Sequence, residues 1–340
     1  MSSMVRKLLT SPPVLTSAMA ALAACSLGAI STASFAQTGT QSPRGNMVAG
    51  QPQFAGAAIA RWEQLQGDAT YTFSTYAGFA LKYPDFPRME IIRSKAESRL
   101  DEEAPSQAEI LAFFDANPPL TNAGRARYAL SLAAAQRGDA FEVAREAWRG
   151  GEMSGPTEAY LTGLYGSRFT PEDHAARVDA LLWQSDAEAV ERNLINLAPG
   201  ERDLALARLA LVRGSSPSAA GLATPAGAMN DAGYVYNLAS YHLKRGDRSA
   251  AINLLKNRPQ LASPAFDAEG LVGVMLTSAE AASVSDTVRI ASKVDDLFAP
   301  ETDISKGSFR LRDRYTDLMW KGGHECPLAP WRWRNRCAYV

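Results

Sequence analysis

The sequence predicts an all-α protein, a right-handed superhelix (solenoid) of stacked helical hairpins. Three observations predict this fold class. From Phe54 onward apolar residues recur at three- and four-residue spacing, helix-capping side chains occur in pairs, and one hairpin pattern occurs twice. No run of alternating β-branched residues is long enough to predict a strand. We therefore expect the helical array to span residues 53–323.

The first 36 residues have the pattern of a secretory signal peptide. Arg6 and Lys7 provide a positively charged start, an apolar stretch follows, and Ala36 ends a small-residue cleavage site. The apolar stretch is short and interrupted by Ser and Thr, which disfavours a transmembrane anchor. Export to the periplasm, with cleavage after Ala36, is the expectation.

Cys25 provides an alternative site of processing during export. It follows Leu22-Ala23-Ala24, which has the form of a bacterial lipobox, so lipidation at Cys25 is the alternative to cleavage after Ala36. Contact with a membrane is expected only in that case. Residues 37–52 are rich in Gly, Ser, Gln and Pro and contain little to bury, which predicts a disordered arm.

Charge and residue spacing exclude several classes of function. Without Arg6 and Lys7 the chain has 33 basic and 36 acidic residues, and no basic stripe indicates a nucleic-acid partner. The chain's three histidines are far apart in sequence, and no cluster around them has the spacing of metal ligands. Gly-rich phosphate loops are absent. We predict no metal, no cofactor and no catalytic residue in this chain. The histidines are His174, for which we expect a surface position, His242 and His324.

Two helix starts carry capping boxes. Ser106 with Glu109, and Thr170 with Asp173, have the spacing at which each side chain satisfies the other residue's free backbone N–H. Pro171 follows Thr170, at the first helical position, where its missing donor costs nothing.

The repeated hairpin covers residues 128–148 and 236–256, which align without a gap. Arg137-Gly138-Asp139 in the first copy matches Arg245-Gly246-Asp247 in the second. We predict that Gly ends the first helix in a left-handed conformation and that Asp caps the second helix. Residues 181–194 form a weaker third copy, with its turn at Ser185-Asp186. This is tetratricopeptide-like stacking with an irregular period.

Four segments resemble the N-terminal superhelical region of soluble lytic murein transglycosylases. The likeness rests on a Tyr-Pro-x-x-Pro helix start at residues 83–87, a Phe-Phe…Pro-Pro-Leu-Thr run and a Leu-Leu-Trp hairpin. In that family the superhelix is a scaffold, and a separate lysozyme-like domain cleaves the glycosidic bond between the sugars of peptidoglycan with one Glu. The four segments are residues 79–100, 110–139, 169–189 and 302–323.

The resemblance implies a scaffold for peptidoglycan turnover, with glycan strands or cell-wall proteins as partners. The family's catalytic Glu-Ser has one counterpart here, Glu97-Ser98, and no Gly-Leu-Met-Gln stretch follows it. We expect Glu97 to lie on a solvent-exposed helix face and the chain to be inactive by itself. The alternative is a free-standing periplasmic solenoid that binds a protein or a glycan.

Other polar and aromatic residues have structural interpretations. The adjacent pairs Glu102-Glu103 and Asp295-Asp296 point about 100° apart on a helix, so we expect solvated side chains rather than acid–base pairs. Four tryptophans at helical spacing among Leu and Ala are expected in the core, although they could stack on sugars. They are Trp62, Trp148, Trp183 and Trp320.

The last 17 residues, 324–340, differ in composition from the rest of the chain. They contain two Cys, two Trp and three Arg, and the helical pattern stops after Gly323. When the codons expected for Trp331–Arg334 are read one base later, they encode a Gly-rich sequence that suits a turn. We therefore expect a frameshifted or truncated product, with a genuine short tail as the alternative.

Overall fold

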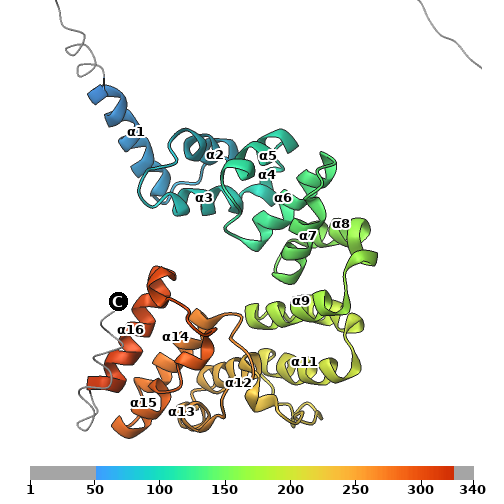
Figure 1. The fold of residues 1–340 in the computed structure, drawn as a ribbon, viewed down its shortest axis with the longest axis vertical. Helices are drawn as coiled ribbons and strands as arrows, with labels where there is room; N and C mark the ends of the chain where they lie inside the picture. The colour runs from blue at the N-terminus through green and yellow to red at the C-terminus, as the bar shows by residue number, and fades with distance from the viewer. Residues whose placement is uncertain (1–50, 325–340) are drawn as a thin grey trace, which may run out of the picture. The chain divides into compact units, whose positions relative to one another are not determined.

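The computed structural model describes residues 51–324, and all regular structure among them is helical, with no strand (Figure 1). Contacts along the chain define two units, Met1–Gly56 and Ala57–Val340, and the sites discussed below belong to the second. The predicted signal peptide with Cys25, residues 37–50 of the predicted arm and residues 325–340 of the tail lie outside the described residues.

The helices have the following bounds: α1 Gln51–Gln66, α2 Phe73–Lys82, α3 Met89–Ser98, α4 Leu100–Glu103, α5 Gln107–Ala116, α6 Asn122–Ala134, α7 Ala140–Arg149, α8 Gly155–Tyr165, α9 Pro171–Gln184, α10 Ala187–Asn193, α11 Pro199–Val212, α12 Ala232–Lys244, α13 Arg248–Asn257, α14 Ala268–Ala279, α15 Val284–Ala291 and α16 Phe309–His324, with short 3₁₀ helices η1 Gly166–Arg168, η2 Leu194–Asn196, η3 Ala228–Asn230, η4 Asp295–Leu297 and η5 Ile304–Lys306.

The all-α prediction is confirmed, and the fold is built by helix-on-helix packing. Neighbours in the chain pack against each other, most extensively α6 with α7, α2 with α3 and α12 with α13, and α14 packs with α16. Helix α1 begins at Gln51. The composition predicts a disordered arm over residues 37–52, so the last two residues of that segment belong to the helix instead.

The buried apolar residues form separate clusters that follow the chain. Four of these clusters span residues 65–114, 126–161, 178–209 and 207–234, and a fifth combines Trp183 with residues 232–319. Each cluster is thus made mostly from helices that are close in sequence, as expected when hairpins bury their apolar faces against their neighbours.

The two aligned hairpins form as predicted, but their turns differ. In the second copy Gly246 is left-handed with φ of 77°, and the Asp247 side chain accepts a hydrogen bond from the Ala250 amide. In the first copy Gln136 is the left-handed residue, with φ of 55°, whereas Gly138 is not. Asp139 makes no capping hydrogen bond there. The glycine and cap assignments were therefore wrong for the first copy.

The capping boxes and the turn of the third hairpin form as predicted. Both capping boxes form, with each side chain bonded to its partner's backbone at Ser106/Glu109 and at Thr170/Asp173. In the weaker third hairpin Ser185 is left-handed and Asp186 caps α10.

The tryptophans divide between core and surface. Trp148 and Trp183 are buried, as expected. Trp62 is partly buried and donates from Nε1 to the Pro87 carbonyl. Trp320 is 67% exposed on α16, so its assignment to the core was wrong. Because one apolar stripe of α16 already faces the core through Leu318 and Met319, Trp320 projects from the opposite side.

Buried arginines connect neighbouring hairpins. Arg177 of α9 donates to the carbonyls of Trp148 and Gly151 at the end of α7, and it pairs with Glu158 of α8 at 3.1 Å. Arg208 of α11 donates to Asn237 of α12. Each guanidinium satisfies groups on another helix, so each one fixes the position of its neighbour.

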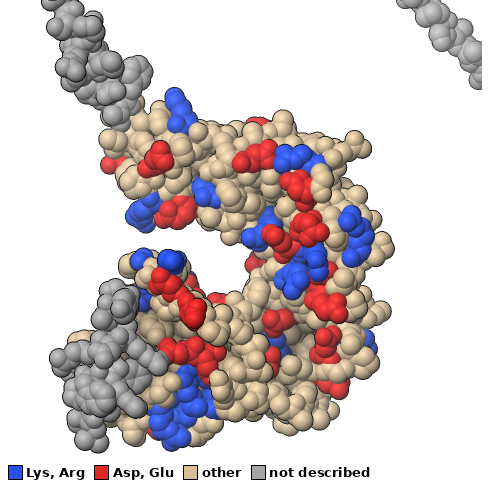
Figure 2. Space-filling view, viewed as in Figure 1, with Lys and Arg blue, Asp and Glu red and all other residues tan. Residues whose placement is uncertain are grey.

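Charged residues of both signs are mixed over the surface. On the face drawn in Figure 2, Lys and Arg are interspersed with Asp and Glu, and no stripe of one sign crosses it. Among the described residues, none of the helices combines the length and apolar character needed to cross a membrane.

Candidate functional site

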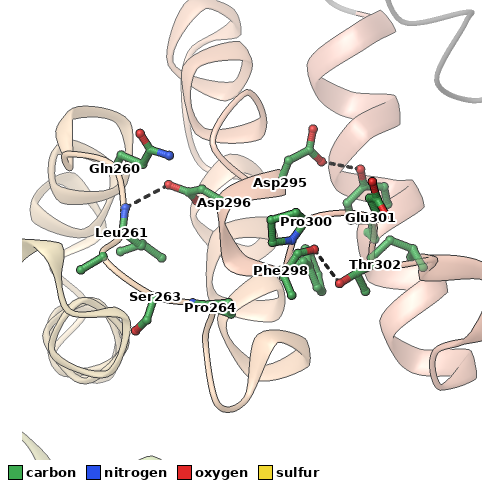
Figure 3. A pocket seen from close by; sticks show the side chains of 14 residues that line it. Gln260, Leu261, Ser263, Pro264, Asp295, Asp296, Phe298, Pro300, Glu301 and Thr302 are labelled. Carbon is green, nitrogen blue, oxygen red and sulfur yellow. Dashed lines mark hydrogen bonds between the residues drawn. The ribbon is translucent and has the colours of Figure 1, made fainter.

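An open pocket lies between two segments that follow helices α13 and α15 (Figure 3). Its volume is about 650 Å³, within the usual range of small-molecule sites. One wall is residues 260–264, the other is residues 295–304, and Tyr315 of α16 completes the lining.

The two walls are held together by Arg258 and Asp296. The Arg258 guanidinium is fully buried and donates to both Asp296 carboxylate oxygens, at 2.7 and 2.6 Å. Arg258 also donates to the Lys293 carbonyl at 2.6 Å, and the Lys293 ammonium donates to the Arg258 carbonyl at 2.7 Å. Four hydrogen bonds therefore join segments that are 35 to 38 residues apart in sequence.

Backbone hydrogen bonds add to this frame. The Leu261 amide donates to Asp296 at 3.3 Å, and the Ala265 amide donates to the Leu297 carbonyl at 2.9 Å. Asn230 donates from its side chain to the Gln260 carbonyl at 2.9 Å. Because both walls are bonded to buried elements, the pocket is formed before any ligand arrives.

The functional groups of the pocket are carboxylates, hydroxyls and aromatic rings. Asp295 accepts a hydrogen bond from the Tyr315 hydroxyl at 2.7 Å. Glu301 is exposed, and its backbone is left-handed with φ of 64°. The rings of Phe298 and Tyr315 lie edge to face, with centroids 6.1 Å apart. This lining suits a polar ligand that also presents apolar surface.

For the pair Asp295-Asp296, the prediction of solvated side chains holds for one residue and fails for the other. Asp295 is exposed, in agreement with a solvated carboxylate. The Asp296 side chain is 18% exposed, and its charge is used to satisfy buried Arg258, so the prediction of a solvated side chain was wrong there. The local pattern could not indicate this, because Arg258 lies 38 residues away.

Glu97 is also placed differently from the prediction. It is 3% exposed, and its carboxylate accepts hydrogen bonds from the Leu120 amide, the Thr121 amide and the Thr121 hydroxyl at 2.6–2.8 Å. The expected solvent-exposed face was wrong because this carboxylate caps the start of α6. All three of these donors belong to the turn before α6, so the carboxylate is used in holding that turn.

Glu97 also lines a smaller pocket, of about 310 Å³, to which Glu152 and Gln184 contribute. Gln184 accepts from the Glu152 amide and donates to the Gly150 carbonyl. These polar groups are bonded to the chain itself, which indicates a structural role for this pocket.

Glu102 and Glu103 differ from each other. Glu102 is exposed as expected. Glu103 accepts from the Phe73 amide at 2.8 Å and from Arg99, and these two bonds lower its pKa. Glu103 therefore caps α2, whose N-terminal amide it binds, and is not simply solvated.

The histidines do not converge. His174 is half-buried rather than on the surface, with its ring edge-on to Trp148 and Phe169, and burial lowers its pKa. His242 lies 3.7 Å from Asp247. The His324 side chain lies outside the description. Within residues 51–324, no group of three His, Cys, Asp or Glu side chains has an arrangement that could hold a metal ion.

Comparison with known proteins gives no relative. No protein-family model, curated protein or solved structure matches this chain. The pocket residues Gln260, Phe298, Glu301 and Tyr315 were not identified from the sequence. They lie on two loops and a helix end, where no periodic pattern signals that they meet.

Proposed function

We propose that the helical array is a scaffold that binds peptidoglycan in the bacterial periplasm, and that its hairpins continue into a right-handed superhelix. The observation that carries the proposal is the pocket between residues 260–264 and 295–304, where carboxylates, an amide, hydroxyls and two aromatic rings lie together. A polymer of sugars and short peptides presents matching hydroxyls, amides and apolar faces.

The resemblance to soluble lytic transglycosylases adds support. Its four segments correspond to helical parts of the structure: α2 with α3, α5 with α6, α9 with the start of α10, and α16.

The role we propose for the described helices is binding, not cleavage. Glu97, the counterpart of the family's catalytic Glu in sequence, holds the start of α6 through three hydrogen bonds. These hydrogen bonds favour a structural role, rather than a catalytic one, for Glu97 of this Glu-Ser pair.

Sedimentation with purified cell-wall sacculi tests the proposal. We expect the native chain to sediment with sacculi and to release no soluble muropeptides over hours, while lysozyme releases them in the same assay. A chain that stays in the supernatant would refute peptidoglycan binding. Release of 1,6-anhydro products would show an enzyme instead.

Export is part of the same proposal, because peptidoglycan is outside the inner membrane. Expression of the full chain in a Gram-negative host should give a periplasmic protein whose N-terminus is Gln37, and Cys25→Ala should not change this. A blocked N-terminus at Cys25 would establish the lipoprotein route, and a cytoplasmic product of full length would refute export.

A protein-binding solenoid is the second candidate, and one surface favours it. The outer side of α8 exposes Tyr160 (65%) and Leu164 (54%), and Ala159 and Gly163 beside them are also exposed. A photoreactive amino acid at position 160 should form a discrete cross-linked product in the periplasm if a protein docks there. The same label at Glu63, which is exposed on α1, serves as the control.

A further inference from the structure

The outer face of α8 is exposed and carries no charge. Its residues recur at three- and four-residue spacing, which places them along one side of the helix. Two of them are large and apolar: Tyr160 is 65% exposed and Leu164 is 54% exposed. We call this set the α8 face, and it consists of Pro156, Ala159, Tyr160, Gly163, Leu164 and Ser167, the last of which lies in η1.

The opposite side of α8 is anchored in the fold. Leu161 is fully buried in the cluster of residues 126–161, and Glu158 pairs with buried Arg177 at 3.1 Å. Tyr160 is not a member of that cluster. In the part of the chain that the structure describes, its side chain has no ring contact and no hydrogen bond. The α8 face is therefore a surface on a fixed helix, and its aromatic ring is available for contact.

The spacing of the α8 face is that of a helix pair. Pro156, Tyr160, Gly163 and Ser167 are four, three and four residues apart, the spacing of the seam along which two helices pack. A second α8 can run antiparallel about a two-fold axis midway between positions 161 and 162. Tyr160 of each copy then lies level with Gly163 of the other, so the face is complementary to itself.

Gly163 leaves room for the ring that this pairing brings to it. A β-carbon added to Gly163 meets no atom within 4 Å, so the space beside this glycine is open. Ala159, one turn earlier on the same face, is also small. Large side chains opposite small ones let two helix surfaces interdigitate. Tyr160 of one copy thus fills an opening that the other copy leaves unfilled.

We propose that the α8 face pairs with the same face of a second copy of this chain, in an antiparallel two-fold dimer. The inference rests on the second candidate function, for which it names the partner, and it is independent of peptidoglycan binding. Because α8 has 11 residues, it is only about 16 Å long and covers less than the about 800 Å² per partner of a standard stable interface. We therefore expect a reversible dimer with a dissociation constant on the order of 10 µM.

Sedimentation velocity of the native chain tests the inference over a range from about 1 µM to about 300 µM. We expect mostly monomer at the lowest concentration and mostly dimer at the highest. A monomer throughout this range would overturn the inference.

An exchange of large and small side chains tests the pairing itself. Gly163→Tyr places two rings at one level, and Tyr160→Ala removes the ring, so each should weaken the dimer at least about tenfold. The double variant again sets a ring beside a small residue, and its affinity should return to within about threefold of the native value. If the double variant associates no better than the single variants, the proposed pairing is wrong.

Gly200→Tyr is the matched control. Gly200 is an exposed glycine of α11, and a β-carbon added there also meets nothing within 4 Å. This variant should leave self-association unchanged, and a loss equal to that of Gly163→Tyr would contradict the assignment to α8. Far-ultraviolet circular dichroism and the unfolding midpoint verify that each variant is folded.

A photoreactive amino acid at position 160 distinguishes a second copy from other occupants. A cross-link to the peptide that contains Gly163 of another copy supports the dimer. A cross-link only to a different protein would leave the protein-binding surface standing and refute the dimer. If Tyr160→Ala prevents sedimentation with sacculi while the native chain stays monomeric, the α8 face binds glycan and the inference is wrong.

Discussion

Glu97 and Gly124 determine how α3 and α6 meet. A β-carbon on Gly124 would overlap Glu97 Oε2, so the carboxylate that caps α6 would have to shift. The contact is long-range, since Glu97 is 24 residues from Thr121, which it also binds.

We predict that Gly124→Ala destabilises the protein by about 1–3 kcal/mol, because the carboxylate must leave its three donors or the helices must separate. Gly163→Ala is the matched control: it is also a helical glycine, with no atom within 4 Å of an added β-carbon. Because alanine has a higher helix propensity than glycine, Gly163→Ala should stabilise the protein by about 0.5–1 kcal/mol. Urea unfolding measures both, and equal effects at the two positions would contradict the packing argument.

Asp173 is predicted to make stability depend on pH. Burial acts to raise its pKa, but the Thr170 amide and Arg145 outweigh burial and hold the pKa below the ordinary value. A lowered folded pKa stabilises the fold above the unfolded pKa of about 3.9, and this stabilisation is lost as the pH falls through the folded value.

The variant Asp173→Asn should therefore lose about 2 kcal/mol at pH 7, and its difference from the native protein should shrink below about pH 4. Asp313→Asn, at an exposed position on α16, is the control and should show a small difference at every pH. Urea unfolding as a function of pH provides the measurement. A difference for Asp173→Asn that persists unchanged into acid would mean that packing, not charge, is responsible.

At the scale of elements, the two aligned hairpins show that the same sequence pattern can form two different turn conformations. Arg-Gly-Asp occurs in both, yet the left-handed residue is Gly246 in one and Gln136 in the other. In the first hairpin Asp139 pairs with Arg137 at 3.2 Å instead of capping α7.

This difference predicts opposite tolerance to the same substitution. Gly246→Ala should destabilise by about 1–2 kcal/mol, because φ of 77° is strained for a residue with a β-carbon. Gly138→Ala should be nearly neutral, since its φ is not left-handed and an added β-carbon meets nothing within 4 Å. Thermal unfolding of both variants gives the comparison, and a large loss for Gly138→Ala would refute it.

Local chemistry explains which elements were predictable. Capping boxes and the Ser185-Asp186 turn depend on residues three or four apart, so the sequence indicates them directly. The burial of Glu97 and Asp296 depends on partners 23 to 38 residues away, brought close only by packing. The candidate site was missed for the same reason, because its walls meet through Arg258 and Asp296.

At the scale of the whole molecule, the core is divided into clusters that follow the chain. Phe73 and Phe113 pack edge to face in the cluster of residues 65–114, and Leu255 belongs to the cluster that ends at residue 319. When each hairpin contacts mainly its neighbours, as in the proposed solenoid, damage to one cluster spreads little to distant ones.

Hydrogen exchange tests this independence. Phe113 is fully buried, and Phe113→Ala should remove about 3–5 kcal/mol of stability, mostly from its own cluster. Amides of α2, α3 and α5 should then exchange faster under native conditions, while those of α12 to α15 keep their rates. Leu255→Ala, which removes an equally buried side chain, should give the reciprocal pattern. If either substitution speeds exchange throughout residues 51–324, the helices unfold as a single cooperative unit, and the solenoid proposal is wrong because its hairpins would not be separable in energy.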